Sequence, residues 1–248
     1  MPSFWGSILF YTKLPLPSWF PIEFDRIARW CPVIGLILGA SLGGIDWGLT
    51  FLGFPPLVRS VSIVALGVSL TGGLHLDGVS DTADGLAVTD PARRLAVMKE
   101  STTGAFGVMA IALILLLKSA ALSELMTNRG LVLMLAMGWA RWGQVAAITF
   151  YPYLRSEGKG ALHRETFKFP QDLLLGLFFL VLFSAVWIYW QPQQWLVILI
   201  TTLLSAAIAL LTGWWFNRQF GGQTGDTYGA IVEWSEALIL CSLTIWFS

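Results

Sequence analysis

The sequence has few charged residues, which make up 12% of its 248 positions. A soluble globular domain carries about 25% charged residues, so a water-soluble enzyme is disfavoured. The formal net charge is zero, which excludes the strongly basic surface that attracts nucleic acid. Cysteine and histidine are also scarce, with two of each. The sequence therefore contains neither a disulfide framework nor a Cys-X-X-Cys metal motif.

Apolar residues account for 56% of the chain, and the mean hydropathy is +0.70. Because a helix needs about 20 apolar residues to cross a bilayer, we expect an all-α polytopic membrane protein with about seven transmembrane helices. The candidate spans are 31–54, 57–76, 104–126, 130–153, 173–190, 195–216 and 228–247. These spans leave little room for a soluble domain, so we expect residues 1–248 to form a single integral-membrane domain.

Basic residues are distributed unevenly between the two sides of the expected bundle. Arg59 and Arg129 lie on one side, and Lys118 and Arg141 lie within spans. The other side holds the rest: Lys13, Arg26, Arg29, Arg93, Arg94, Lys99, Arg155, Lys159, Arg164, Lys168 and Arg218. Since cytoplasmic loops are enriched in lysine and arginine, we expect the N-terminus and the long polar connections in the cytoplasm.

The densest polar motif is residues 72–85, which read Gly-Gly-Leu-His-Leu-Asp-Gly-Val-Ser-Asp-Thr-Ala-Asp-Gly. If this stretch is helical, Asp77, Asp81 and Asp84 fall within an arc of about 60°. Three carboxylates this close repel one another, so we expect a cation among them. Oxygen ligands favour Mg²⁺ or Mn²⁺. Because Mg²⁺ takes one or two carboxylates plus substrate phosphates, the motif predicts a phosphorylated substrate, with a diphosphate favoured.

The aspartates of this motif, His75 and the later Asp226 each have an expected role and an alternative. Asp77, Asp81 and Asp84 are candidate metal ligands, and one of them, with Asp84 favoured, is a candidate base for an attacking hydroxyl. The alternative is a solvated acidic helix end, which the cost of placing charges near a bilayer disfavours. His75 is a candidate phosphate donor or base, or a packed interfacial histidine. Asp226 is a candidate fourth ligand, or the N-cap of the last helix.

The sequence resembles the cobalamin synthase family, the adenosylcobinamide-GDP ribazoletransferases. Residues 72–85 carry this resemblance together with residues 221–227, Gly-Gly-Gln-Thr-Gly-Asp-Thr, which Tyr228, Glu233 and Glu236 follow. The resemblance implies a Mg²⁺-dependent enzyme of the bacterial inner membrane with its active site at the cytoplasmic face. It implies transfer of the adenosylcobinamide-phosphate group from adenosylcobinamide-GDP to the 5′-hydroxyl of α-ribazole, or of its 5′-phosphate, with release of GMP. Thr102 departs from the family pattern, which often has a basic residue at this position.

Further residues are candidates for substrate contacts or for ion pairing inside the bilayer. The candidates for phosphate and nucleotide binding are Lys99, Ser101, Arg155, Lys159, Gln223 and Thr224, although basic residues at the cytoplasmic side also serve topology alone. Counting about 1.5 Å per helical residue places Arg141 at the depth of Glu236 or Glu233, so we expect an ion pair there. The same count places Lys118 about 21 Å deep, nearer the outer half.

Other functions remain open on the sequence alone. The aspartates also suit a Mg²⁺-dependent membrane transferase of the CDP-alcohol or prenyl type, although neither the spacing of the former nor the second acidic motif of the latter is present. A cation transporter would place such aspartates near the membrane midplane. A non-catalytic membrane scaffold would not need them at all.

Overall fold

The computed structural model describes residues 2–100, 102–156 and 158–248, with the side chain of Lys159 also left undescribed. The described chain is helical and contains no strand beyond an isolated bridge between Tyr153 and Gln223. The helices are α1 (Pro2–Tyr11), η1 (Ile27–Trp30), α2 (Cys31–Phe51), α3 (Pro56–Thr71), α4 (Leu74–Ala87), α5 (Pro91–Val97), α6 (Ala105–Glu124), α7 (Arg129–Phe150), α8 (Lys159–Thr166), α9 (Gln171–Trp190), η2 (Pro192–Gln194), α10 (Trp195–Phe220) and α11 (Gly225–Phe247).

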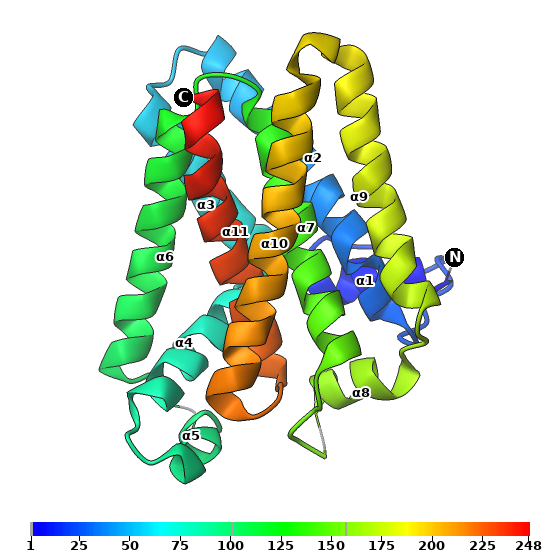
Figure 1. Cartoon of the computed structure of the whole chain (residues 1–248), viewed down its shortest axis with the longest axis vertical. Helices are drawn as coiled ribbons and strands as arrows, with labels where there is room; N and C mark the ends of the chain where they lie inside the picture. Colours follow the sequence, from blue (N-terminus) through cyan, green and yellow to red (C-terminus); the bar gives the residue numbers. More distant parts are fainter. Residues whose placement is uncertain (1, 101, 157) are drawn as a thin grey trace.

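Six helical segments are long and apolar enough to cross a membrane, and a bent pair makes up to seven. They contain α2, α6, α7, α9, α10 and α11, which confirms six of the expected spans to within a few residues at each end. The α9–α10 turn and the C-terminus lie at the upper end in Figure 1, whereas α4, α5 and α8 lie at the lower end. The long polar connections therefore gather at one end of the bundle.

The expected span 57–76 is wrong as a continuous helix. The chain bends by 94° between α3 and α4. The cause is a pair of glycines, Gly72 and Gly73, with φ angles of 62° and 69°. This left-handed conformation ends an α-helix and is cheap only for glycine. As a result α4 turns away from the direction of α3, and it carries the aspartates across the lower end of the bundle.

Helix α7 forms the centre of the bundle, between α2, α9, α10 and α11 (Figure 1). Small residues allow α2 to approach it closely, because a Cβ added at Gly39 or Gly43 would overlap the backbone of Met134 or Gly130. The Gly35-X-X-X-Gly39-X-X-X-Gly43 stripe is thus covered by α7 of the same chain. Helix α11 packs against both α7 and α4, which places its first turn beside the acidic motif.

Candidate active site

The acidic motif lies on α4, as its spacing predicts. Asp77 is exposed, whereas Asp81 and Asp84 are partly buried. Helix α4 crosses α11 in backbone contact, because a Cβ added at Gly78 would overlap the carbonyl oxygen of Asp226. Glycine at this position is what allows Asp77, on α4, and Asp226, on the first turn of α11, to line the same cavity.

Asp84 is engaged in holding the structure together. Its Oδ2 accepts a hydrogen bond from the backbone N–H of Gly104 at 2.7 Å, and its Oδ1 accepts one from Gly107 at 2.9 Å. These donors belong to the N-terminal end of α6, whose first N–H groups have no partner within the helix. A negative charge at a helix N-terminus is also favourable electrostatically. The geometry therefore argues against Asp84 as the free base that the sequence favoured.

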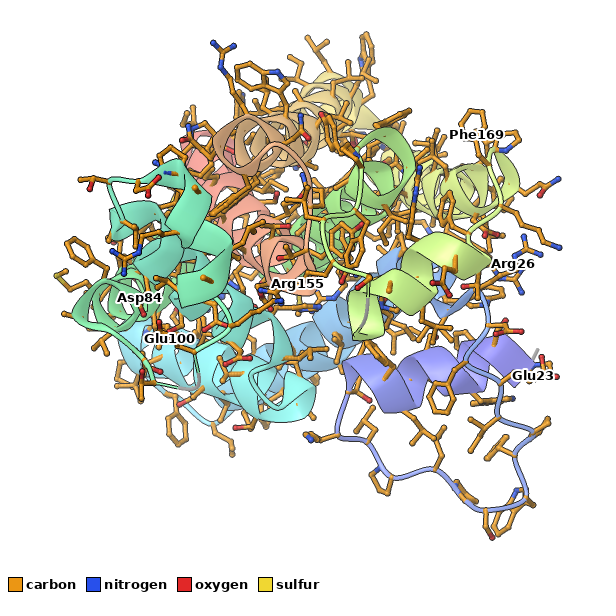
Figure 2. The ribbon with its side chains drawn as sticks, turned by 90° about the horizontal axis from the view of Figure 1, so that it is seen from below. Glu23, Arg26, Asp84, Glu100, Arg155 and Phe169 are labelled. Carbon is orange, nitrogen blue, oxygen red and sulfur yellow. The ribbon has the colours of Figure 1, made fainter. Side chains whose placement is uncertain are left out.

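Asp226 is paired with Arg155, whose Nη2 lies 2.8 Å from Asp226 Oδ2. Arg155 lies near the middle of the lower face in Figure 2, whereas Asp84 lies toward the left side. The N-cap of α11 is Thr224 rather than Asp226, because the Thr224 hydroxyl accepts from the Thr227 N–H in a capping box. Asp226 is thus left with its carboxylate facing the site and a single cationic partner.

The carboxylates of this site form one electrostatic group. The negative charges of Asp77, Asp226 and Asp84 act on Asp81, and Arg155 provides the opposing positive charge. Among the described residues, no three or more His, Cys, Asp or Glu side chains form a closed metal site. An open pair of carboxylates suits Mg²⁺, which usually completes its shell with water and substrate phosphates. The donor set of Asp77 and Asp81 therefore fits that ion.

The other candidates for substrate binding have mixed outcomes. Gln223 and Thr224 are fully buried, and the Gln223 side chain donates to the Gly213 carbonyl at 3.1 Å, so they stabilise the α10–α11 turn. Lys99 is exposed in the segment after α5 and lines neither of the two cavities beside Asp77. Lys159 begins α8, but its side chain is not described, and Ser101 lies outside the described residues. Arg155 alone is placed directly at the aspartates.

One cavity beside Asp77, which we call the aromatic cavity, has a volume of about 240 Å³. Its wall includes Tyr11, His75, Tyr153, His163 and Tyr228. The Tyr11 hydroxyl lies 3.4 Å from Nε2 of His163, and it accepts a hydrogen bond from Gln144 Nε2 at 3.3 Å. Burial lowers the pKa of His163 to about 4, so its ring is neutral near pH 7. His163 therefore forms part of the cavity wall as a buried, neutral ring.

A second and larger cavity, which we call the glycine-turn groove, has a volume of about 580 Å³. Lys13, Gly72, Gly73, Ser80 and Thr103 contribute to its wall. Lys13 is held there, because its backbone N–H donates to the Leu70 carbonyl at 2.7 Å.

The two cavities adjoin at α4. Asp77 lines both of them, together with Phe10 and Leu74. The arrangement provides two binding spaces with one carboxylate of the acidic motif between them.

Sequence reasoning missed most of the cavity walls. Tyr11 comes from α1, Gln144 from α7 and Tyr153 from the segment after α7. Tyr228 directly follows one of the stretches that carry the family resemblance, and that was the only available signal for it.

The buried charges inside the bundle are paired. Arg141 Nη1 lies 3.3 Å from Glu236 Oε2, which is one of the two pairings expected from depth. Lys118 Nζ lies 2.6 Å from Glu233 and 2.8 Å from Glu236, so Lys118 shares the two acids that the depth count assigned to Arg141. The four side chains link α6, α7 and α11 in the interior of the bundle. A paired network of this kind avoids the cost of isolated charges in the bilayer.

Comparisons with known proteins place the chain in a family. The family model described as cobalamin-5-phosphate synthase matches residues 3–244. A protein of Trichormus variabilis named adenosylcobinamide-GDP ribazoletransferase is 53% identical, with 97% of this chain and 95% of its own length covered. Proteins of the same name from Synechocystis sp. and Desulfitobacterium hafniense are 54% and 37% identical, again over 97% of this chain and over 93% and 95% of their own lengths. No solved structure gives a significant match. The chain belongs to the cobalamin-5-phosphate synthase family.

Proposed function

We propose that this protein is an adenosylcobinamide-GDP ribazoletransferase. It transfers the adenosylcobinamide-phosphate group from adenosylcobinamide-GDP to the 5′-hydroxyl of α-ribazole, or of α-ribazole 5′-phosphate. GMP is the leaving group, and the product is the completed nucleotide loop of cobalamin. The family match over residues 3–244 and the name shared by its relatives support this activity.

The observation that carries the proposal is the position of Asp77 between two adjoining cavities. A transfer between two substrates needs both of them held against the same reacting atoms. Phosphoryl transfer also depends more on positioning and charge neutralisation than on covalent help from the protein. A carboxylate between two binding spaces meets both requirements.

Asp77 and Asp81 would hold Mg²⁺, since their carboxylates are the ones not already bonded to backbone N–H groups or to Arg155. When bound, the ion would neutralise the charge of the diphosphate and of the leaving GMP. Arg155 lies close enough to exchange Asp226 for a phosphate oxygen, because both are anionic acceptors of its guanidinium. Asp226, released in this way, would accept the proton of the attacking hydroxyl.

The site would face the cytoplasm of a bacterial inner membrane. The basic residues Arg93, Arg155 and Arg218 belong to the connections that gather at the lower end of the bundle. The opposite end has Arg59 and Arg129, and both are paired with Asp46. Cytoplasmic loops are enriched in lysine and arginine, so this distribution supports the orientation.

The test is turnover by the purified protein in lipid nanodiscs. Adenosylcobinamide-GDP and α-ribazole are supplied with Mg²⁺ or with EDTA, and GMP and the cobalamin product are followed by mass spectrometry. We expect both products with Mg²⁺ and neither with EDTA. The Asp77→Ala and Asp81→Ala variants should insert normally and lose turnover. A folded wild-type protein that forms no product under these conditions would disprove the assignment.

A further inference from the structure

We infer that the two cavities divide the substrates between them. The aromatic cavity takes the acceptor, an aromatic-base nucleoside, and the glycine-turn groove takes the diphosphate of the donor. This inference rests on the proposed function and adds to it which substrate lies on which side of Asp77. It also assigns Tyr228 and Lys13 as residues that bind the acceptor and the donor, respectively.

The walls of the aromatic cavity suit a planar base. Tyr153 and Tyr228 stack with ring centroids 5.9 Å apart and an interplanar angle of 25°. On another part of the wall, Tyr11 stacks on His163 at 6.0 Å and 19°. Aromatic side chains bind bases through their π-faces without needing a particular pattern of hydrogen bonds. A fused aromatic base can therefore contact either of these stacked pairs.

Buried polar atoms in the same wall lack partners within the protein. Neither ring nitrogen of His75 has a hydrogen-bond partner among the described residues, and the same holds for Nδ1 of His163 and the hydroxyl of Tyr228. These side chains are 2% to 4% exposed. Because buried polar groups are nearly always hydrogen-bonded, a ligand with several hydroxyls would complete this set. A ribonucleoside carries three hydroxyls on its ribose.

Size and charge separate the two cavities. The aromatic cavity, at about 240 Å³, is smaller than the roughly 300–1,000 Å³ of most small-ligand sites, so it favours the smaller substrate, the nucleoside, over the corrinoid nucleotide. The glycine-turn groove, at about 580 Å³, is larger, and the cationic residue Lys13 lines it. Gly73 also leaves open space in this groove, because a Cβ added there would meet no atom within 4 Å, and this allows a phosphate to approach closely.

The experiment measures KM for each substrate in turn, with the other saturating. Tyr228→Phe removes one unpartnered hydroxyl and keeps the ring. We expect the KM for α-ribazole to rise about two- to tenfold, the effect of one neutral hydrogen bond, while the KM for adenosylcobinamide-GDP stays unchanged. Lys13→Ala should show the opposite pattern. Tyr189→Phe is the matched control, because Tyr189 is 82% exposed and lies at the end of α9 away from the site.

Several outcomes would overturn the division of substrates. One is a rise in the donor KM with Tyr228→Phe, and another is the absence of any change in the acceptor KM. The thermal unfolding midpoint of each variant shows whether it folds. If Tyr228→Phe does not fold, Lys13→Ala decides alone, because Lys13 is exposed; a change in its acceptor KM, or no change in its donor KM, contradicts the inference. An inactive wild-type protein would instead disprove the proposed function.

Discussion

The Asp84→Ala variant tests whether this carboxylate stabilises the fold or takes part in catalysis. Asp84→Ala removes two hydrogen bonds that a charged acceptor receives from the backbone of α6. A hydrogen bond to a charged group contributes about 1.5–3 kcal/mol, and because Asp84 is partly exposed we use the lower value for each bond, or about 3 kcal/mol in all. For a chain of this size, each kcal/mol lowers Tm by about 2–4 °C, so we expect a decrease of about 6–12 °C.

Asp77→Ala should behave in the opposite way. Asp77 is exposed, and among the described residues none donates a hydrogen bond to its side chain, so its removal should change stability by less than about 0.5 kcal/mol. Turnover should nevertheless be abolished. Unfolding is followed by tryptophan fluorescence during heating in detergent, and turnover by release of GMP well below Tm. At that temperature Asp84→Ala should retain measurable turnover.

Asp90 provides the matched control for this comparison. Its carboxylate also caps a helix, but it receives one N–H, from Ala92 at 3.0 Å, and it is exposed. Asp90→Ala should therefore cost only about 1 kcal/mol and leave turnover intact. If Asp84→Ala instead unfolds at the wild-type temperature and has no turnover, the structural role assigned to Asp84 is wrong.

Two further predictions concern buried groups. Arg141→Glu should destabilise the protein by about 3–5 kcal/mol, because it buries a like charge beside Glu236, whereas Arg141→Lys keeps the positive charge and should cost much less; equal losses of Tm in the two variants would argue against direct pairing. The pKa of His163 is about 4 in the folded protein, below its ordinary 6.5, so the neutral ring is favoured by folding. The contribution of the neutral His163 ring to the free energy of unfolding is complete above pH 6.5 and is lost as pH falls toward 4. Tm should therefore fall more steeply in this window for the wild type than for His163→Asn. Equal slopes would contradict the assignment.

The membrane helices follow from hydropathy, whereas the bend between α3 and α4 does not. Residues 57–76 carry a single charged residue, Arg59, so a hydropathy window passes through Gly72 and Gly73 without detecting the left-handed turn. The helical spacing of Asp77, Asp81 and Asp84 predicts their common stripe. Which of these carboxylates is free to bind a ligand depends on tertiary structure, because the N–H that bonds to Asp84 belongs to Gly104, 20 residues further along the chain.

The depth calculation shows how a boundary error propagates. The last span was expected to begin at 228, but α11 begins at Gly225, which places Glu236 about 17 Å along its helix instead of about 12 Å. Lys118, about 20 Å along α6, then comes level with it. The aromatic cavity is harder still to predict, because α1, α4, α7, α8 and α11 each contribute to it and no local pattern connects them.

The most direct test of the central claim is a titration with Mn²⁺ as a spectroscopic substitute for Mg²⁺. Electron paramagnetic resonance of the protein in nanodiscs, with adenosylcobinamide-GDP present, measures how much Mn²⁺ is bound. We predict saturable binding by the wild type and by Asp90→Ala, and loss of that binding in Asp77→Asn and Asp81→Asn. Mn²⁺ binding that is unchanged in both of these α4 variants would show that the ion is held elsewhere.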